Sequence, residues 1–345
     1  MITASRHPAQ YAARENPSST RRSRWQELWR EAITDPRELL EAVDLGHLAS
    51  RLLPSGDPGF ALRVPRGFVA RMRRGDANDP LLLQVLPLAA ELGEVPGFTR
   101  DAVGDLAART AHGVLQKYAG RVLLVTTGSC AVHCRYCFRR HFPYAEEIAA
   151  TDRWRAAVEH VRNDTTVHEV ILSGGDPLSL ATPKLAELTQ ALAGIPHLKR
   201  LRLHTRLPIV LPERVDPELC AWLRGLPWPT TVVLHANHAN ELDAGVAEAC
   251  AALRAAGALL LNQSVLLRGI NDAVETLAGL SERLVDCGVV PYYLHQLDRV
   301  AGAAHFAVDD ERARALVDAL RGRLSGYLVP RLVREIAGEP GKTPL

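Results

Sequence analysis

The sequence of 345 residues contains 41 basic and 39 acidic residues, a formal net charge of +2, and 47% hydrophobic residues. This balance excludes nucleic-acid binding by bulk charge, and the apolar fraction is that of an ordinary globular protein. No apolar run reaches the roughly 18 residues that span a bilayer, and no hydrophobic signal segment follows Met1, so we expect a soluble, cytoplasmic protein with no membrane partner.

The first third of the sequence predicts a tail followed by short helices. Residues 1–23 are polar, rich in Arg and Ser and without apolar periodicity, which predicts a disordered tail. From Trp25 onwards apolar residues recur at helical spacing, and Asp35-Pro36 is typical of a helix start. We therefore expect a helical N-terminal region at residues 24–117, with no recognisable chemistry before its last residues.

The remaining two thirds alternate apolar strands with amphipathic helices. The predicted strands are residues 122–126, 169–172, 200–203, 231–234, 259–263 and 289–294, and the predicted helices are residues 152–161, 183–192, 241–256, 274–287 and 309–324. Such alternation indicates an α/β fold with a parallel sheet covered by helices. Six units predict a partial (β/α)6 barrel over residues 118–345, and an open sheet with central crossovers is the alternative.

Polar residues follow each predicted strand directly, where parallel α/β folds collect their chemistry. These strand ends carry Cys130, Ser173-Gly174-Gly175-Asp176, His204-Thr205-Arg206, His235-Ala236-Asn237-His238, Asn262-Gln263-Ser264 and His295-Gln296-Leu297-Asp298. The coincidence across six strands predicts one functional site at this edge of the sheet.

Three closely spaced cysteines, Cys130, Cys134 and Cys137, follow the first predicted strand. Thiolates at this spacing suit an iron–sulfur cluster or zinc, and His141 would complete the ligand set of an RNA-binding zinc finger. We favour a [4Fe–4S] cluster because the triplet lies inside a chain of strand–helix units, and three ligands leave one iron open to a small molecule. The other cysteines, Cys220, Cys250 and Cys287, are predicted to be core residues.

Two further motifs agree with a cofactor site. The pair Gly174-Gly175 allows a ligand to approach the backbone closely, and Asp176 could accept a hydrogen bond from an amino group. Lys342 lies in a glycine-containing segment at the C-terminal end. Such a lysine is normally a solvated charge, but pyridoxal phosphate (PLP) needs a lysine with which to form a Schiff base.

Together these motifs resemble the lysine 2,3-aminomutases, a family of radical S-adenosylmethionine (SAM) enzymes. The resemblance covers about residues 118–345 and is carried by Cys-x3-Cys-Arg-Tyr-Cys, Ser-Gly-Gly-Asp-Pro, Asn-Gln-Ser-Val-Leu-Leu-Arg-Gly-Ile-Asn-Asp, Pro-Tyr-Tyr and Lys-Thr-Pro. The stretch Cys-Phe-Arg-Arg-His-Phe-Pro-Tyr at residues 137–144, the short helical N-terminus and the end soon after Lys-Thr-Pro are most similar to the members that make (R)-β-lysine for elongation factor P. A separate ligase attaches that product.

The resemblance implies an isomerase that moves the amino group of L-lysine, with a [4Fe–4S] cluster, SAM and PLP as cofactors. It implies an electron donor such as flavodoxin or ferredoxin and leaves a homo-oligomer open. Matched residue by residue, it implies Lys342 as the Schiff-base lysine; Lys117, Tyr118 and Arg121 around PLP; Tyr136, Gly174, Gly175, Asp176, His235 and Gln263 around SAM; and Arg139, Asp298 and Glu335 around the substrate.

Departures from the family pattern bear on the substrate and on zinc. Glu335 stands where members that act on free lysine have aspartate, and Lys117 stands where the family has arginine. Ala273 replaces a zinc-binding cysteine, so we expect no structural zinc. A catabolic or osmolyte-producing lysine 2,3-aminomutase, a glutamate 2,3-aminomutase and a zinc- and RNA-binding module are the alternatives. Asp298 and Glu335 would repel the side chain of glutamate.

Overall fold

The computed structural model describes residues 23–54, 60–149 and 154–345. All of the predicted tail except Ser23 lies outside these residues. The N-terminal part of the described chain consists of short helices: α1 (Arg24–Arg30), α2 (Pro36–Ala42), η1 (Gly46–Arg51), α3 (Arg66–Val69), α4 (Pro80–Leu83) and η2 (Ala89–Leu92). Asp35 and Asp79 cap α2 and α4 through their carboxylates, and each is followed by a proline at the first helical position.

The helical prediction is wrong for the end of this region. Residues 109–118 contain the strands β1 (Arg109–Ala111) and β2 (Val114–Tyr118), which pair antiparallel with each other, and β2 also pairs antiparallel with β3. Gly113 joins them with a φ of 69°, and a Cβ there would lie 2.4 Å from the backbone nitrogen of Ala149. The hairpin therefore requires a glycine at this position, both for the positive φ of the turn and for the close approach to Ala149.

In the part of the chain that the structure describes, the sheet has ten strands whose order in space follows the chain from β1 to β10, and the run from β3 to β9 is parallel. The remaining strands are β3 (Arg121–Thr127), β4 (Glu169–Gly174), β5 (Arg200–Thr205), β6 (Thr230–Leu234), β7 (Leu259–Val265), β8 (Val290–His295), β9 (Arg331–Arg334) and β10 (Thr343–Pro344). All six predicted strands are confirmed as β3–β8. Within the described residues the sheet is not closed, as expected of a partial barrel, and its strand order contains no central crossover.

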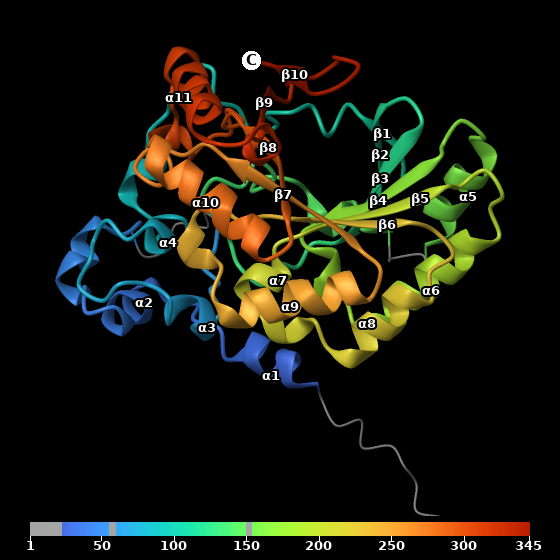
Figure 1. Ribbon diagram of the computed structural model, residues 1–345, viewed down its shortest axis with the longest axis horizontal. Coiled ribbons are helices and arrows are strands. Elements are labelled where there is room, and N and C mark those ends of the chain that lie inside the picture. Colours follow the sequence, from blue (N-terminus) through green and yellow to red (C-terminus); the bar gives the residue numbers. More distant parts are fainter. Residues whose placement is uncertain (1–22, 55–59, 150–153) are drawn as a thin grey trace, which may run out of the picture.

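Helices connect the strands and cover one side of the sheet (Figure 1). They are α5 (Arg155–Asn163), α6 (Thr182–Ala193), α7 (Leu207–Val210), α8 (Pro217–Arg224), α9 (Ala244–Ala255), α10 (Val274–Asp286) and α11 (Asp310–Arg323). Short 3-10 turns are η3 (Tyr144–Glu146), η5 (Pro177–Ser179), η6 (Pro212–Arg214), η7 (Ala239–Glu241), η8 (Ala304–Phe306) and η9 (Gly326–Leu328). Among the described helices, none is long and apolar enough to span a membrane.

Alternation along the strands separates the core from the polar side of the sheet. In β5, Leu201 and Leu203 are buried in the main apolar core, whereas Arg202 and His204 line a cavity on the other side. The same core includes Trp25, Leu39 and other residues of the N-terminal helices, so this region packs as part of the domain. Cys220, Cys250 and Cys287 are buried in it, which confirms their prediction as core residues.

Candidate functional site

A cavity of about 400 Å³ lies at the C-terminal ends of the parallel strands. Every residue that the sequence proposed for the site lines it: Lys117, Tyr118, Arg121, Cys130, Cys134, Tyr136, Cys137, Arg139, Gly174, Gly175, Asp176, His235, Gln263, Asp298, Glu335 and Lys342. They come from eight strands or strand ends, spread over more than 220 residues of sequence. A single cavity therefore collects groups that are distant in sequence.

The three cysteines of the loop after β3 lie at one side of this cavity as free thiols. Two turns fold the loop: the backbone N–H of Cys137 donates to the carbonyl oxygen of Cys134 at 3.0 Å, and that of Arg140 donates to Cys137 at 3.1 Å. Burial, together with the nearby thiol of Cys134, raises the pKa of Cys137 to about 12. A bound metal would reverse this effect, because coordination deprotonates a thiol.

The zinc alternative does not fit this loop. The side chain of His141 contacts the carbonyl oxygen of Ala301 at 3.1 Å and does not line the cavity with the thiols. Three thiols that open onto a cavity fit a [4Fe–4S] cluster with one open iron.

The glycine pair after β4 packs directly against the start of the cysteine loop. The N–H of Gly175 donates to the carbonyl oxygen of Thr127 at 2.6 Å, and the N–H of Asp176 donates to that of Ser129 at 2.8 Å. A Cβ at Gly175 would lie 2.4 Å from the oxygen of Ser129. Glycine is therefore required here for the contact between two segments of the protein, in addition to any ligand.

The expected role of Asp176 needs correction. One carboxylate oxygen accepts from the hydroxyl of Thr205 at 2.7 Å and the N–H of Leu178 at 3.0 Å. The other accepts from the N–H groups of Arg206 and Leu207 at 2.7 and 3.0 Å. These four donors occupy the lone pairs of the carboxylate, so Asp176 holds the turns after β4 and β5 and has no acceptor left for an amino group of a ligand.

Tyr136 and His235 form the wall of the cavity next to the cysteines. Their rings stack with centroids 5.7 Å apart, and the hydroxyl of Tyr136 lies 3.0 Å from Nε2 of His235. Burial lowers the pKa of His235 to about 3, and the charge of Arg206 adds to this, so the imidazole is neutral at physiological pH. Gln263, on the inward side of β7, completes the set proposed for SAM.

Lys342 lines the cavity because β10 pairs antiparallel with β9 and so returns the chain beside Glu335. Its ammonium donates to Oε2 of Glu335 at 2.7 Å, and the hydroxyl of Tyr118 donates to Oε1 at 2.7 Å. Burial alone would raise the pKa of Glu335, but the charge and hydrogen bond of Lys342 lower it below its usual value. The guanidinium of Arg121 lies over the ring of Tyr118, 4.4 Å from its centroid.

Asp105 is a site residue that the sequence did not reveal. Its carboxylate accepts from Nε of Arg139 at 2.6 Å and forms an ion pair with Lys117 at 2.7 Å. Arg139 also donates to the hydroxyl of Ser173 at 3.2 Å. Asp105 lies in a segment before β1 that contains no motif, so only the folded chain places it beside Arg139. Gln84 and Glu241, which contact Arg206 beside the cysteine loop, were also missed, because neither belongs to a motif.

Asp298 has a carboxylate oxygen, Oδ1, that is buried without a hydrogen-bond partner in the described structure. Burial raises its pKa to about 7; Lys342 opposes this shift and Glu335 reinforces it. Nε2 of His204, which also lines the cavity, is likewise buried and unpaired among the described residues. Since buried polar atoms are almost always hydrogen-bonded in proteins, these two atoms indicate a polar ligand in the cavity.

Comparison with known proteins agrees with this chemistry. The radical SAM superfamily matches residues 124–280. The L-lysine 2,3-aminomutase of Escherichia coli (strain K12) is 48% identical over 327 residues, which cover 94% of this chain and 95% of that protein. The enzyme of the same name from Haemophilus influenzae is 43% identical over 95% of this chain and 97% of its own, and that of Clostridium subterminale is 37% identical over 78% and 65%.

Proposed function

The chain belongs to the L-lysine 2,3-aminomutase family of radical SAM enzymes, and from this membership we propose that it converts L-α-lysine into (R)-β-lysine. We also propose that it uses PLP as well as a [4Fe–4S] cluster and SAM, and that it works in the cytoplasm. The observation that carries the proposal is the single cavity that contains three thiols, Lys342 and the acidic residues Asp298 and Glu335.

The cofactors would occupy two sides of the cavity. Cys130, Cys134 and Cys137 would hold the cluster, with SAM against Tyr136, Gly174, Gly175, His235 and Gln263, and Lys342 would hold PLP with Lys117, Tyr118 and Arg121 around it. The donor chemistry fits each group: soft thiolates suit iron, and cationic side chains suit a phosphate. When bound, the cluster and SAM supply abstraction of an unreactive hydrogen atom, and PLP supplies a conjugated ring that delocalises an unpaired electron.

The protein's own residues would bind and orient the substrate between these groups. The guanidinium of Arg139 is fixed by Asp105 and Ser173, and its remaining terminal nitrogen would meet the α-carboxylate. Asp298, with its unpaired oxygen, would accept the ε-ammonium group, and Glu335 would support it from the neighbouring strand. The carboxylates of Asp298 and Glu335 would attract the cationic side chain of lysine and repel the anionic side chain of glutamate.

We further propose that the product serves elongation factor P, where a lysyl ligase attaches it. Two features support this proposal: the stretch from His141 to Tyr144, and Glu335 in place of aspartate. Tyr144 is part of the site, because its hydroxyl donates to the carbonyl oxygen of Gly174 at 2.9 Å and its ring fills the space beside Gly128. A slow enzyme suffices when its product modifies one protein. The side chain of Glu335, which is one methylene longer than aspartate, is compatible with slow turnover.

Two experiments test the proposal. Anaerobic incubation with L-lysine, SAM, PLP and dithionite, followed by chiral analysis, is expected to give (R)-β-lysine; the absence of any β-amino acid would contradict the aminomutase assignment. Deletion of the gene should remove the β-lysyl adduct from elongation factor P, as seen by intact mass, and added (R)-β-lysine should restore it. An unchanged adduct together with lost growth on lysine would favour a catabolic aminomutase.

A further inference from the structure

Arg206, the residue that follows β5, joins the cysteine loop to the interior of the protein. Its Nη1 donates to Sγ of Cys134 and to the hydroxyl of Tyr136, both at 2.7 Å. Its Nη2 donates to Oε1 of Gln84 at 2.7 Å and to Oε2 of Glu241 at 2.8 Å. The side chain is only 7% exposed, so these contacts are made in an environment that excludes water.

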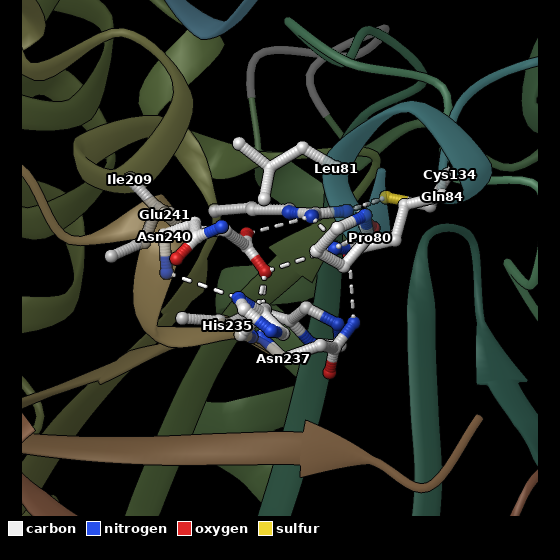
Figure 2. Close-up of polar contacts among 12 residues, drawn as sticks. Pro80, Leu81, Gln84, Cys134, Ile209, His235, Asn237, Asn240 and Glu241 are labelled. Atoms are coloured by element: carbon white, nitrogen blue, oxygen red, sulfur yellow. Dashed lines mark hydrogen bonds and ion pairs between the residues drawn. The ribbon is translucent and has the colours of Figure 1, made fainter. Parts of the chain in front are cut away.

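The acceptors of this guanidinium are themselves fixed. Oε1 of Glu241 accepts from the N–H of Asn237 at 2.8 Å and from Nε2 of Gln84 at 3.1 Å (Figure 2). The side-chain amide of Asn237 donates to Gln84 at 3.0 Å and to the hydroxyl of Tyr136 at 2.7 Å. Gln84, Glu241 and Asn237 are fully buried. Apart from Nε of Arg206, which has no hydrogen-bond partner in the described structure, the polar groups of this buried network are paired, and paired buried networks are rigid. The network includes Gln84, a residue of the N-terminal helical region.

The backbone of Arg206 also contacts Asp176, the residue that follows the glycine pair Gly174-Gly175. Its N–H donates to Asp176 at 2.7 Å, and Asp176 in turn donates its own N–H to the oxygen of Ser129, just before Cys130. Arg206 is therefore linked to the cysteine loop in two ways: directly through its guanidinium, which contacts Cys134 and Tyr136, and indirectly through Asp176, which contacts Ser129. Nothing in the sequence pattern distinguishes it from the other polar residues at strand ends.

We propose that Arg206 is a positioning residue of the cluster: it orients Cys134 and, by donating a charge-assisted hydrogen bond to its sulfur, raises the reduction potential of the bound cluster. This inference rests on the proposed function, since it needs the cluster. Reduction adds a negative charge, and a cation and hydrogen-bond donor at a ligand sulfur stabilise the reduced form more than the oxidised form. The cluster can then accept its electron from a weaker reductant.

The test compares Arg206→Met and Arg206→Lys with wild-type protein reconstituted anaerobically. Iron and sulfide are measured, and the midpoint potential is titrated by electron paramagnetic resonance without lysine. We expect a shift to more negative potential in Arg206→Met and a smaller shift in Arg206→Lys. Arg214→Met is the matched control, because Arg214 is also fully buried but donates to Leu178 and Leu180 and contacts no sulfur. It should leave the potential unchanged.

A full cluster at the wild-type potential in Arg206→Met would overturn the proposal. If that variant fails to fold, the double variant Arg206→Met/Glu241→Gln replaces it, because it leaves no unpaired buried charge. A full cluster at the wild-type potential in the double variant would equally overturn the proposal. Loss of iron from every Arg206 variant, with thermal melting of the cofactor-free chain unchanged, would show that Cys134 needs Arg206 to bind the cluster. A wild-type protein with a reducible cluster but no β-lysine formation would overturn the proposed function and leave this inference standing.

Discussion

Replacement of Asp298 by asparagine should stabilise the cofactor-free protein at alkaline pH. The pKa of Asp298 is raised from an ordinary 3.8 to about 7, first by burial, so the folded state favours the protonated carboxyl. Asp298 therefore contributes its full stabilisation of the folded state when the pH is below 3.8, its ordinary pKa, and this stabilisation is lost as the pH rises through its pKa in the folded chain, about 7. From pH 5 to pH 8 the wild-type chain should lose about 2 to 3 kcal/mol through Asp298 alone.

The assay is urea unfolding of the wild-type and Asp298→Asn chains at pH 5 and pH 8. The variant cannot ionise at this position, so the difference in unfolding free energy between variant and wild type should rise by about 2 to 3 kcal/mol between the two pH values. Comparison of two pH values cancels the fixed cost of exchanging a hydroxyl for an amide. Asp164→Asn is the control: hydrogen bonds from Gln116 and Thr166 lower the pKa of that exposed carboxylate to about 2, so it stays ionised throughout.

If the difference in unfolding free energy between variant and wild type is the same at pH 5 and pH 8, the reasoning is refuted, because Asp298 would then not ionise between these pH values in the folded chain. A binding measurement extends the test. Since an ammonium group favours the carboxylate, addition of L-lysine to the cofactor-loaded protein at pH 7 should release a proton from Asp298. Calorimetry in buffers of different ionisation enthalpy detects that proton, and Asp298→Asn should lose it.

Three further predictions concern the cofactors. Cys134→Ala should abolish the brown colour and the cleavage of SAM, and full iron content would count against a cluster bound there. Gly175→Ala adds a Cβ that would lie 2.4 Å from the oxygen of Ser129, so we expect a loss of about 1 to 3 kcal/mol in unfolding free energy and a lower iron content; wild-type values of both would contradict the close approach. Borohydride reduction of the PLP-loaded protein should place the pyridoxyl group on Lys342 by peptide mapping, and a label found only on Lys184 would exclude that assignment.

Strands β3 to β8 could be predicted because each is rich in leucine or β-branched residues. Strands β1, β2, β9 and β10 were not predicted; in β9, residues Arg331–Arg334, two buried residues stand between two arginines and give no such signal. This strand determines the site, because Glu335 follows it directly and β10 returns Lys342 beside it. The sequence therefore indicated that residues 335–342 belong to the site, while the pairing that brings the two ends of this segment together was not visible in it.

Contacts between distant segments were the part that sequence could not supply. Gln84 and Asp105 lie in the region predicted to have no chemistry, yet they meet Arg206 and Arg139 inside the fold. Asp176 shows the opposite case: its position at a strand end was predicted, but its acceptors are used by backbone donors of the next strand end. Motif spacing indicates where a residue lies, and only the neighbouring strands decide what it binds.

The charges within the cavity bear on how a lysine substrate would be held. Asp105 is paired with Arg139, Asp176 is saturated by four donors, and Glu335 is bound by Lys342 and Tyr118. Among these cavity carboxylates of the described chain, Oδ1 of Asp298 is buried with neither a hydrogen bond nor an ion pair, whereas Oδ1 of Asp105 is paired with Lys117. The extra methylene of Glu335, compared with aspartate, lengthens its reach to the lysine that would carry PLP. The substrate's ammonium group would then be bound mainly by Asp298 for as long as Lys342 is paired with Glu335. Binding of PLP to Lys342 would free Glu335 to bind the ammonium group as well, so PLP binding would strengthen substrate binding.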